Sequence, residues 1–266
     1  MNILVCIKQV PDTTEIKIDP VTNTLIRAGV PSIVNPFDAY ALEIAARIKD
    51  VTPGTKITLL CMGPQQATAA LKECLAVGGD KAYLVSDRAF GGADTLATSY
   101  TLKVAIDKIE ALEGKFDIIF CGKQAIDGDT AQVGPEIAEH MDCPQITYAV
   151  EAKVEGDEVL VKRETGDGYE VLAAKLPCVV TVTKPSFNPR YPSIKSKMAA
   201  NRAVINTLTV NDIPVDATRI GLKGSPTKVK KSFTPPQKQG GVVITEESGE
   251  ESAKKLFGLL NAENII

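Results

Sequence analysis

Two periodicities alternate along residues 1–145, and this alternation restricts the possible folds more than any other feature of the chain. Short apolar runs occur at residues 3–7, 57–62, 82–85 and 117–121. The segments between them repeat apolar residues three and four positions apart, as in 41–48, 71–75 and 96–112. Strands that alternate with amphipathic helices form parallel sheets, because the crossover helices cover both faces. The sequence therefore predicts an α/β fold with a doubly wound, mostly parallel sheet.

The pattern changes after residue 145. Polar and apolar residues alternate in three segments, and the turn sequences Glu155-Gly156-Asp157 and Gly166-Asp167-Gly168 separate them. Alternation interrupted by glycine-containing turns is typical of antiparallel hairpins, so we expect an appendage of hairpins over 147–174. The apolar run 177–182 then predicts a buried strand that returns to the sheet.

The remaining third of the chain differs in charge and regularity. Residues 184–231 contain ten Lys and Arg against two Asp and Glu, although the whole chain has a net charge of −3. We expect an irregular basic segment there, after a first domain of residues 1–183. Residues 232–266 would form a C-terminal arm with a short amphipathic helix near 252–261. This helix has an apolar side but no core of its own, so we expect the arm to pack on a partner subunit.

Composition excludes several classes of function. His140 is the sole histidine and no Cys-x-x-Cys pair occurs, so we expect no metal site and no catalytic side chain. The six scattered cysteines suit a cytoplasmic protein with reduced thiols. No apolar run reaches the ~20 residues that cross a bilayer. The basic segment has few aromatic residues and the chain is acidic overall, which argues against nucleic acid.

A candidate ligand site follows the apolar run 117–121. Residues 122–135 join this strand to a helix at the carboxyl edge of the sheet, where open α/β folds bind ligands. If Pro135 lies in the first helical turn, the amides of residues 130–133 are unpaired donors at the positive end of a helix, which suits a phosphate.

Side chains of the same loop suit the rest of a nucleotide. Gly122 and Gly128 would let a ligand approach the backbone closely, and Asp127 and Asp129 could accept hydrogen bonds from ribose hydroxyls. A helix start that is simply capped by Asp129 or Thr130, with no ligand, explains this loop equally well.

Two further loops favour the ligand. Residues 6–9 end the first strand, and residues 35–38 begin the first long helix. In a doubly wound sheet, the loops after the first and fourth strands meet where the strand order reverses. Three loops at this place predict a pocket for an adenine nucleotide.

The same segments resemble a known family, the beta subunits of electron transfer flavoproteins. The resemblance covers nearly the whole chain and depends on residues 4–10, 35–38, 122–127, 161–181 and 190–191. One departure is Gly166, where the family has an acidic residue; it lies in an expected turn. The resemblance implies a Rossmann-like nucleotide-binding domain over 1–183 and a heterodimer with an alpha subunit. By matching positions, it places the cofactor contacts on Cys6, Asn35, Pro36, Phe37, Asp38, Met62, Gly122, Lys123, Gln124, Ala125, Ile126, Asp127, Gly128, Asp129, Thr130, Ala131, Gln132 and Val133.

The resemblance also implies a role. Residues 127–135 are similar to those of electron-bifurcating members, which bind FAD here, accept hydride from NADH and pass electrons to ferredoxin or flavodoxin. The second electron goes through the alpha-subunit FAD to an acyl-CoA dehydrogenase. In simple members of the family the same pocket holds a structural AMP, and this alternative stays open. A stand-alone nucleotide sensor is a third reading, but it would need neither the hairpins nor the long arm.

Residues of the hairpins and the basic segment match contact positions of the family. Residues 190–195 resemble the loop that docks on the dehydrogenase, with Ile194 as the apolar anchor and Lys195 beside it. Glu164 matches a position that contacts the alpha subunit. An exposed apolar residue among positive charges suits transient docking, because charge steers the encounter and the anchor sets the register.

Overall fold

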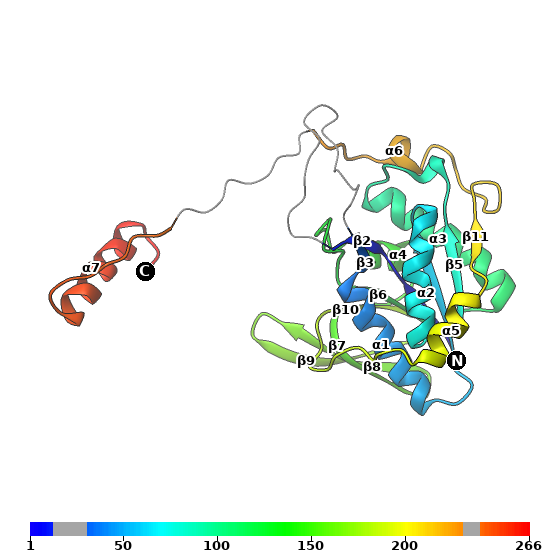
Figure 1. Ribbon diagram of the computed structural model, residues 1–266, viewed down its shortest axis with the longest axis horizontal. Coiled ribbons are helices and arrows are strands. Elements are labelled where there is room, and N and C mark those ends of the chain that lie inside the picture. The colour runs from blue at the N-terminus through cyan, green and yellow to red at the C-terminus, as the bar shows by residue number, and fades with distance from the viewer. Residues whose placement is uncertain (13–30, 231–239) are drawn as a thin grey trace. The chain divides into compact units, whose positions relative to one another are not determined.

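The computed structural model describes residues 1–12, 31–230 and 240–266. Its main feature is a nine-stranded sheet with the strand order β11-β5-β4-β1-β6-β10-β7-β8-β9 (Figure 1). The strands are β1 (Asn2–Cys6), β4 (Lys56–Met62), β5 (Lys81–Val85), β6 (Ile118–Gly122), β7 (Gln145–Glu155), β8 (Glu158–Thr165), β9 (Gly168–Lys175), β10 (Cys178–Val182) and β11 (Asn206–Leu208). A small antiparallel sheet pairs β2 (Gln9–Pro11) with β3 (Ser32–Val34).

The first half of the chain is doubly wound, as predicted. β1 pairs in parallel with β4 on one side and with β6 on the other, and β4 pairs in parallel with β5. The chain therefore builds the sheet outward from β1 in one direction and then crosses to the other side of β1. The strand order reverses between β1 and β6, and this is where open α/β sheets bind ligands.

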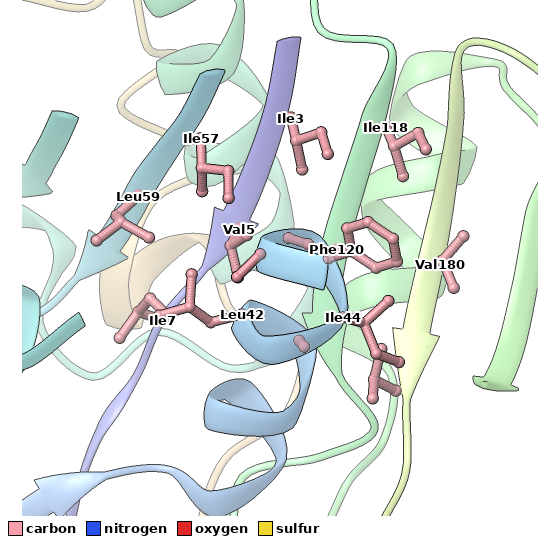
Figure 2. Packing of buried hydrophobic residues seen from close by; sticks show 14 of the residues in the cluster. Ile3, Val5, Ile7, Leu42, Ile44, Ile57, Leu59, Ile118, Phe120 and Val180 are labelled. Carbon is pink, nitrogen blue, oxygen red and sulfur yellow. The ribbon is translucent and has the colours of Figure 1, made fainter. Parts of the chain in front are cut away.

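Helices cover both faces of this sheet. They are α1 (Pro36–Val51), α2 (Thr68–Val77), α3 (Thr95–Glu113) and α4 (Val133–Met141), with short 3-10 turns η1 (Gln65–Ala67) and η2 (Arg88–Phe90). α1 and α2 share one buried cluster with the strands, whereas α3 and α4 share a second. Figure 2 shows the first cluster, in which Leu42 and Ile44 of α1 lie against Val5 and Phe120. Two separate cores confirm the layered α/β architecture.

The predicted hairpins are present but belong to the same sheet. β7, β8 and β9 pair in antiparallel fashion over the range expected from the alternation. β10 then inserts between β6 and β7 and pairs in parallel with both. The start of β7 is therefore a parallel strand, which the alternation in its sequence did not indicate.

Residues 184–230 are more regular than expected. They contain α5 (Ile194–Arg202), β11 and α6 (Gly221–Gly224), and β11 extends the sheet by pairing in parallel with β5. The segment therefore contains regular elements that the sequence did not indicate, joined by irregular stretches. β11 has three residues and α5 buries Ala200 alone, so neither produces a clear periodicity in the sequence. Residues 1–12 and 31–230 belong to one compact unit.

Residues 240–266 belong to a second unit. Their helix, α7 (Gly249–Ala262), includes the predicted range, and Ser248 caps it by accepting a hydrogen bond from the amide of Glu251 (3.2 Å). Within this segment the side chains of Leu256 and Phe257 are 48% and 63% exposed. The expected boundary between residues 231 and 232 lies outside the described residues. No helix in the described part of the chain is both long and apolar enough to cross a membrane.

Candidate nucleotide-binding site

Asp38 joins the three predicted loops. Its carboxylate accepts hydrogen bonds from the amide of Lys8, after β1 (2.7 Å), and from the amide of Gly122, at the end of β6 (3.1 Å). A third donor is Nδ2 of Asn35, just before α1 (2.9 Å). The loops after the first and fourth parallel strands and the start of α1 therefore meet, as predicted from the order of the elements.

Asn35 connects the start of α1 to the loop after β6. This buried side chain donates from Nδ2 to the carbonyl of Gln124 (2.8 Å), and its Oδ1 accepts from the amide of Ile126 (3.2 Å). Although Asn35 stands at the N-cap of α1, its side chain makes no capping hydrogen bond. Its polar atoms bind the loop instead, so residues 124–126 have a fixed position.

Gly122 has a structural role that its place in the sequence did not indicate. A Cβ at this position would lie 2.3 Å from Oδ1 of Asp38 and 2.8 Å from its backbone nitrogen. The glycine therefore allows α1, rather than a ligand, to approach β6. Gly128 differs, because nothing lies within 4 Å of its Cβ position among the described atoms, and the backbone there is accessible.

The start of α4 offers free hydrogen-bond donors. Its N-cap is Gln132, which forms no side-chain cap, so the expected capping by Asp129 or Thr130 is not found. The amides of residues 130–134 donate to no acceptor among the described residues. Asp129 and Ala131 both have positive φ (53° and 54°), a conformation that is rare for residues other than glycine. The loop thus holds a strained backbone that leaves successive amides unpaired at the positive end of a helix.

Close packing fixes the position of this helix start. A Cβ on Gly134 would lie 2.6 Å from Cγ2 of Thr181 in β10, so the glycine lets α4 lie directly against the sheet. Pro135 is the third residue of α4, within the first turn as predicted, and it has no N–H that would need a partner there.

The two aspartates expected to face ribose already have protein partners. Nζ of Lys8 forms an ion pair with Oδ1 of Asp127 (2.6 Å), and Nε2 of Gln124 donates to Oδ1 of Asp129. Within the described part of the chain, their Oδ2 atoms accept no hydrogen bond. Each aspartate therefore keeps one oxygen for a further donor.

Burial dominates the electrostatics of Asp38. Removal from water raises the pKa of this carboxyl to about 7, although hydrogen bonds from Asn35, Lys8 and Gly122 act to lower it.

Across residues 1–12, 31–230 and 240–266, no three His, Cys, Asp or Glu side chains gather as ligands of a metal ion would.

The other predicted contact positions lie around the same edge. Cys6 and Met62 end neighbouring parallel strands, β1 and β4, and both are partly buried. Pro36 and Phe37 form the first turn of α1. Lys123 and Ala125 follow β6, and the amide of Lys123 donates to the carbonyl of Val182 in β10 (2.7 Å).

The predicted docking residues are placed elsewhere. Ile194 begins α5 and is 82% exposed, and Lys195 follows it. Arg190 holds the preceding loop on α1 through ion pairs with Glu43 (Nε to Oε2, 2.9 Å) and Asp50 (Nη2 to Oδ2, 2.7 Å). Glu164 lies near the end of β8 and is exposed.

Tyr148 and Thr181 also reach this part of the molecule, and neither was predicted. The amide of Tyr148 donates to Oγ1 of Thr181 (3.2 Å), and Nζ of Lys123 lies 5.1 Å from the centre of the Tyr148 ring. A tyrosine inside an alternating strand carries no sign of an unusual backbone, so the sequence alone could not reveal it.

Comparisons with known proteins agree with this architecture. The profile of the electron transfer flavoprotein domain matches residues 22–213. The electron transfer flavoprotein subunit beta of Megasphaera elsdenii is 56% identical over the whole of both chains. The caffeyl-CoA reductase-Etf complex subunit CarD of Acetobacterium woodii is 50% identical, again over both whole chains. The acryloyl-CoA reductase electron transfer subunit gamma of Anaerotignum propionicum is 44% identical over both whole chains. The chain therefore belongs to the electron transfer flavoprotein family, among its beta subunits.

Proposed function

We propose that this chain is the beta subunit of an electron-bifurcating electron transfer flavoprotein and that it binds FAD at the site described above. Electrons would enter as hydride from NADH. They would leave to ferredoxin or flavodoxin and, through the FAD of an alpha subunit, to an acyl-CoA dehydrogenase. The observation that carries this proposal is the run of amides over residues 130–134 that donate to no acceptor among the described residues.

The donor set suits a diphosphate. Unpaired backbone amides at a helix start bind phosphate groups, because the amides donate hydrogen bonds and the helix dipole favours negative charge. Five successive donors can serve two adjacent phosphate groups more fully than one. The positive φ of Asp129 and Ala131 supports a ligand role, since strained backbone gathers at functional sites.

The buried framework suits the rest of the nucleotide. The free oxygens of Asp127 and Asp129 would accept hydrogen bonds from ribose hydroxyls. Asn35 and Asp38 would act indirectly, because their polar atoms are engaged in holding the loops together. The chain's contribution is thus to bind and orient the cofactor.

The bound FAD would supply the redox chemistry, since a flavin takes up hydride and can release electrons singly. No side chain of this subunit has to act as a nucleophile or general base. This agrees with a chain whose sole histidine is His140, in the last turn of α4. The side chains instead surround the cofactor and set its electrostatic environment.

The names of two relatives support the proposed electron-exchange partner. CarD belongs to a caffeyl-CoA reductase-Etf complex, and the subunit gamma relative serves an acryloyl-CoA reductase. A CoA-ester reductase or dehydrogenase is therefore the expected electron-exchange partner, in addition to the alpha subunit. The six cysteines are free thiols, which supports a reducing, cytoplasmic environment.

Counting the bound nucleotides tests the proposal. The chain should be purified together with its alpha subunit, the complex denatured, and the released FAD and AMP measured per heterodimer. Two FAD and no AMP are expected. One FAD and one AMP would contradict the proposal and select the simple carrier, in which this subunit has a structural nucleotide and no redox centre.

A further inference from the structure

Tyr148 has a backbone conformation that its residue type does not favour. Its φ is +60°, in the left-handed region, where a bulky side chain is an outlier. It lies in β7 between Ile146 and Ala149, where the pairing with β10 shifts in register, and the pairing with β8 shifts just after it, between Ala149 and Glu151. A glycine would make this bend without strain. The bend alone therefore does not explain why a tyrosine stands here.

Neighbouring groups hold the strained residue in place. The amide of Tyr148 donates to Oγ1 of Thr181 (3.2 Å). Arg163 donates from Nε to the carbonyl of Thr147 (2.9 Å) and from Nη2 to Oγ1 of the same threonine (3.0 Å). Backbone strain that neighbouring groups hold in place is typical of functional sites. β-Bulges often orient a side chain at such sites.

The ring of Tyr148 lies beside the candidate site. Lys123 begins the loop that ends in the free amides, and its Nζ lies over the ring, 5.1 Å from the centre. Thr181 connects the two regions, because its Oγ1 holds Tyr148 while its Cγ2 lies against Gly134 at the start of α4. Tyr148 also lines a shallow depression that is open to solvent, together with residues 163–166.

We propose that Tyr148 and Lys123 form the wall against which the flavin ring of the cofactor stacks. This inference rests on the proposed function, since AMP has no such ring. A flavin is a flat, electron-poor aromatic system, and an aromatic side chain offers it a stacking surface. The ammonium of Lys123 complements the carbonyl oxygens at the edge of the ring. The site thus has two parts, one for the phosphates at α4 and one for the ring at Tyr148.

The substitution Tyr148→Gly separates the ring from the backbone bend. Glycine keeps the left-handed conformation without strain, so the variant should unfold at the same temperature as the wild type or higher. Tyr148→Phe is the matched control, because it keeps the aromatic ring. Both are made in the complex with the alpha subunit, and the nucleotide of the beta-subunit site is removed before titration.

Binding is then measured separately for FAD and for AMP. We expect Tyr148→Gly to raise the Kd for FAD about ten-fold, which corresponds to ~1.4 kcal/mol for the loss of one aromatic stack. The Kd for AMP should change less than about two-fold, and the fluorescence of the bound flavin should increase. Tyr148→Phe should resemble the wild type in every measurement.

If the wild-type protein binds FAD, two results would overturn this assignment. Equal weakening of FAD and AMP would mean that Tyr148 supports the fold of the site alone, and an unchanged Kd for FAD would mean that the ring does not stack on it. A wild-type site that binds AMP but no FAD would instead contradict the proposed function, and this inference with it.

Discussion

The buried carboxyl of Asp38 predicts a specific dependence of stability on pH. Its pKa of about 7 in the folded chain is well above the 3.8 of an exposed aspartate. The folded state therefore binds this proton more tightly than the unfolded state does. Such a group stabilises the fold at low pH, and the contribution is lost as the pH rises from about 4 to about 7.

Asp38→Asn isolates this contribution, because asparagine has nearly the same shape and does not ionise in this range. The quantity to follow is the free energy of unfolding of the wild type minus that of the variant. It should fall by about 1.4 kcal/mol for each pH unit between the two pKa values. Between pH 4.5 and 7.5 the fall should total about 3 kcal/mol, and above that range the difference should be constant.

Urea unfolding of the full chain at half-unit steps of pH provides the measurement, provided that the m-values of the two proteins agree. Asp50→Asn is a suitable control, because hydrogen bonds from Arg190 lower the pKa of Asp50 instead. The free energy of unfolding of the wild type minus that of Asp50→Asn should not change above about pH 5. A flat curve for Asp38→Asn would refute the reasoning. A rising curve would mean that the three donors outweigh burial and keep the carboxylate ionised.

Four further substitutions test other parts of the molecule. Gly122→Ala should destabilise the fold by about 3 kcal/mol, because its Cβ would meet the backbone of α1, whereas Gly128→Ala should cost under about 1 kcal/mol in the same urea titration. Thr130→Arg should expel the nucleotide by crowding the start of α4; unchanged nucleotide content in the purified complex would reject the placement of the phosphates. Ile194→Ala should slow electron transfer to the dehydrogenase partner and spare reduction of an artificial dye by NADH. Loss of both activities together would point to misfolding.

The order of the elements could be predicted because it depends on local signals. Apolar runs and helical repeats specify β1, β4, β5 and β6, and the rules of doubly wound sheets then place β1 beside β6. Pro135 likewise indicated where α4 begins and hence where its free amides lie.

The remaining features depend on contacts that are distant in sequence. Gly122 is constrained by Asp38, 84 residues earlier, and this changes the explanation for the glycine. β11 pairs with β5 although its own three residues have little strand character. The left-handed Tyr148 depends on Thr181 and on Arg163, which no local pattern could indicate.

Hydrogen–deuterium exchange of the amides at residues 130–134 tests the central claim most directly. These groups have no acceptor among the described residues, so they should exchange rapidly in the complex once the beta-subunit nucleotide has been removed. Addition of FAD should slow their exchange at least about ten-fold, while peptides from the hairpin β8–β9 far from Tyr148 stay unchanged. Rapid exchange of these amides in the FAD-saturated complex would contradict the claim that they hold the phosphates.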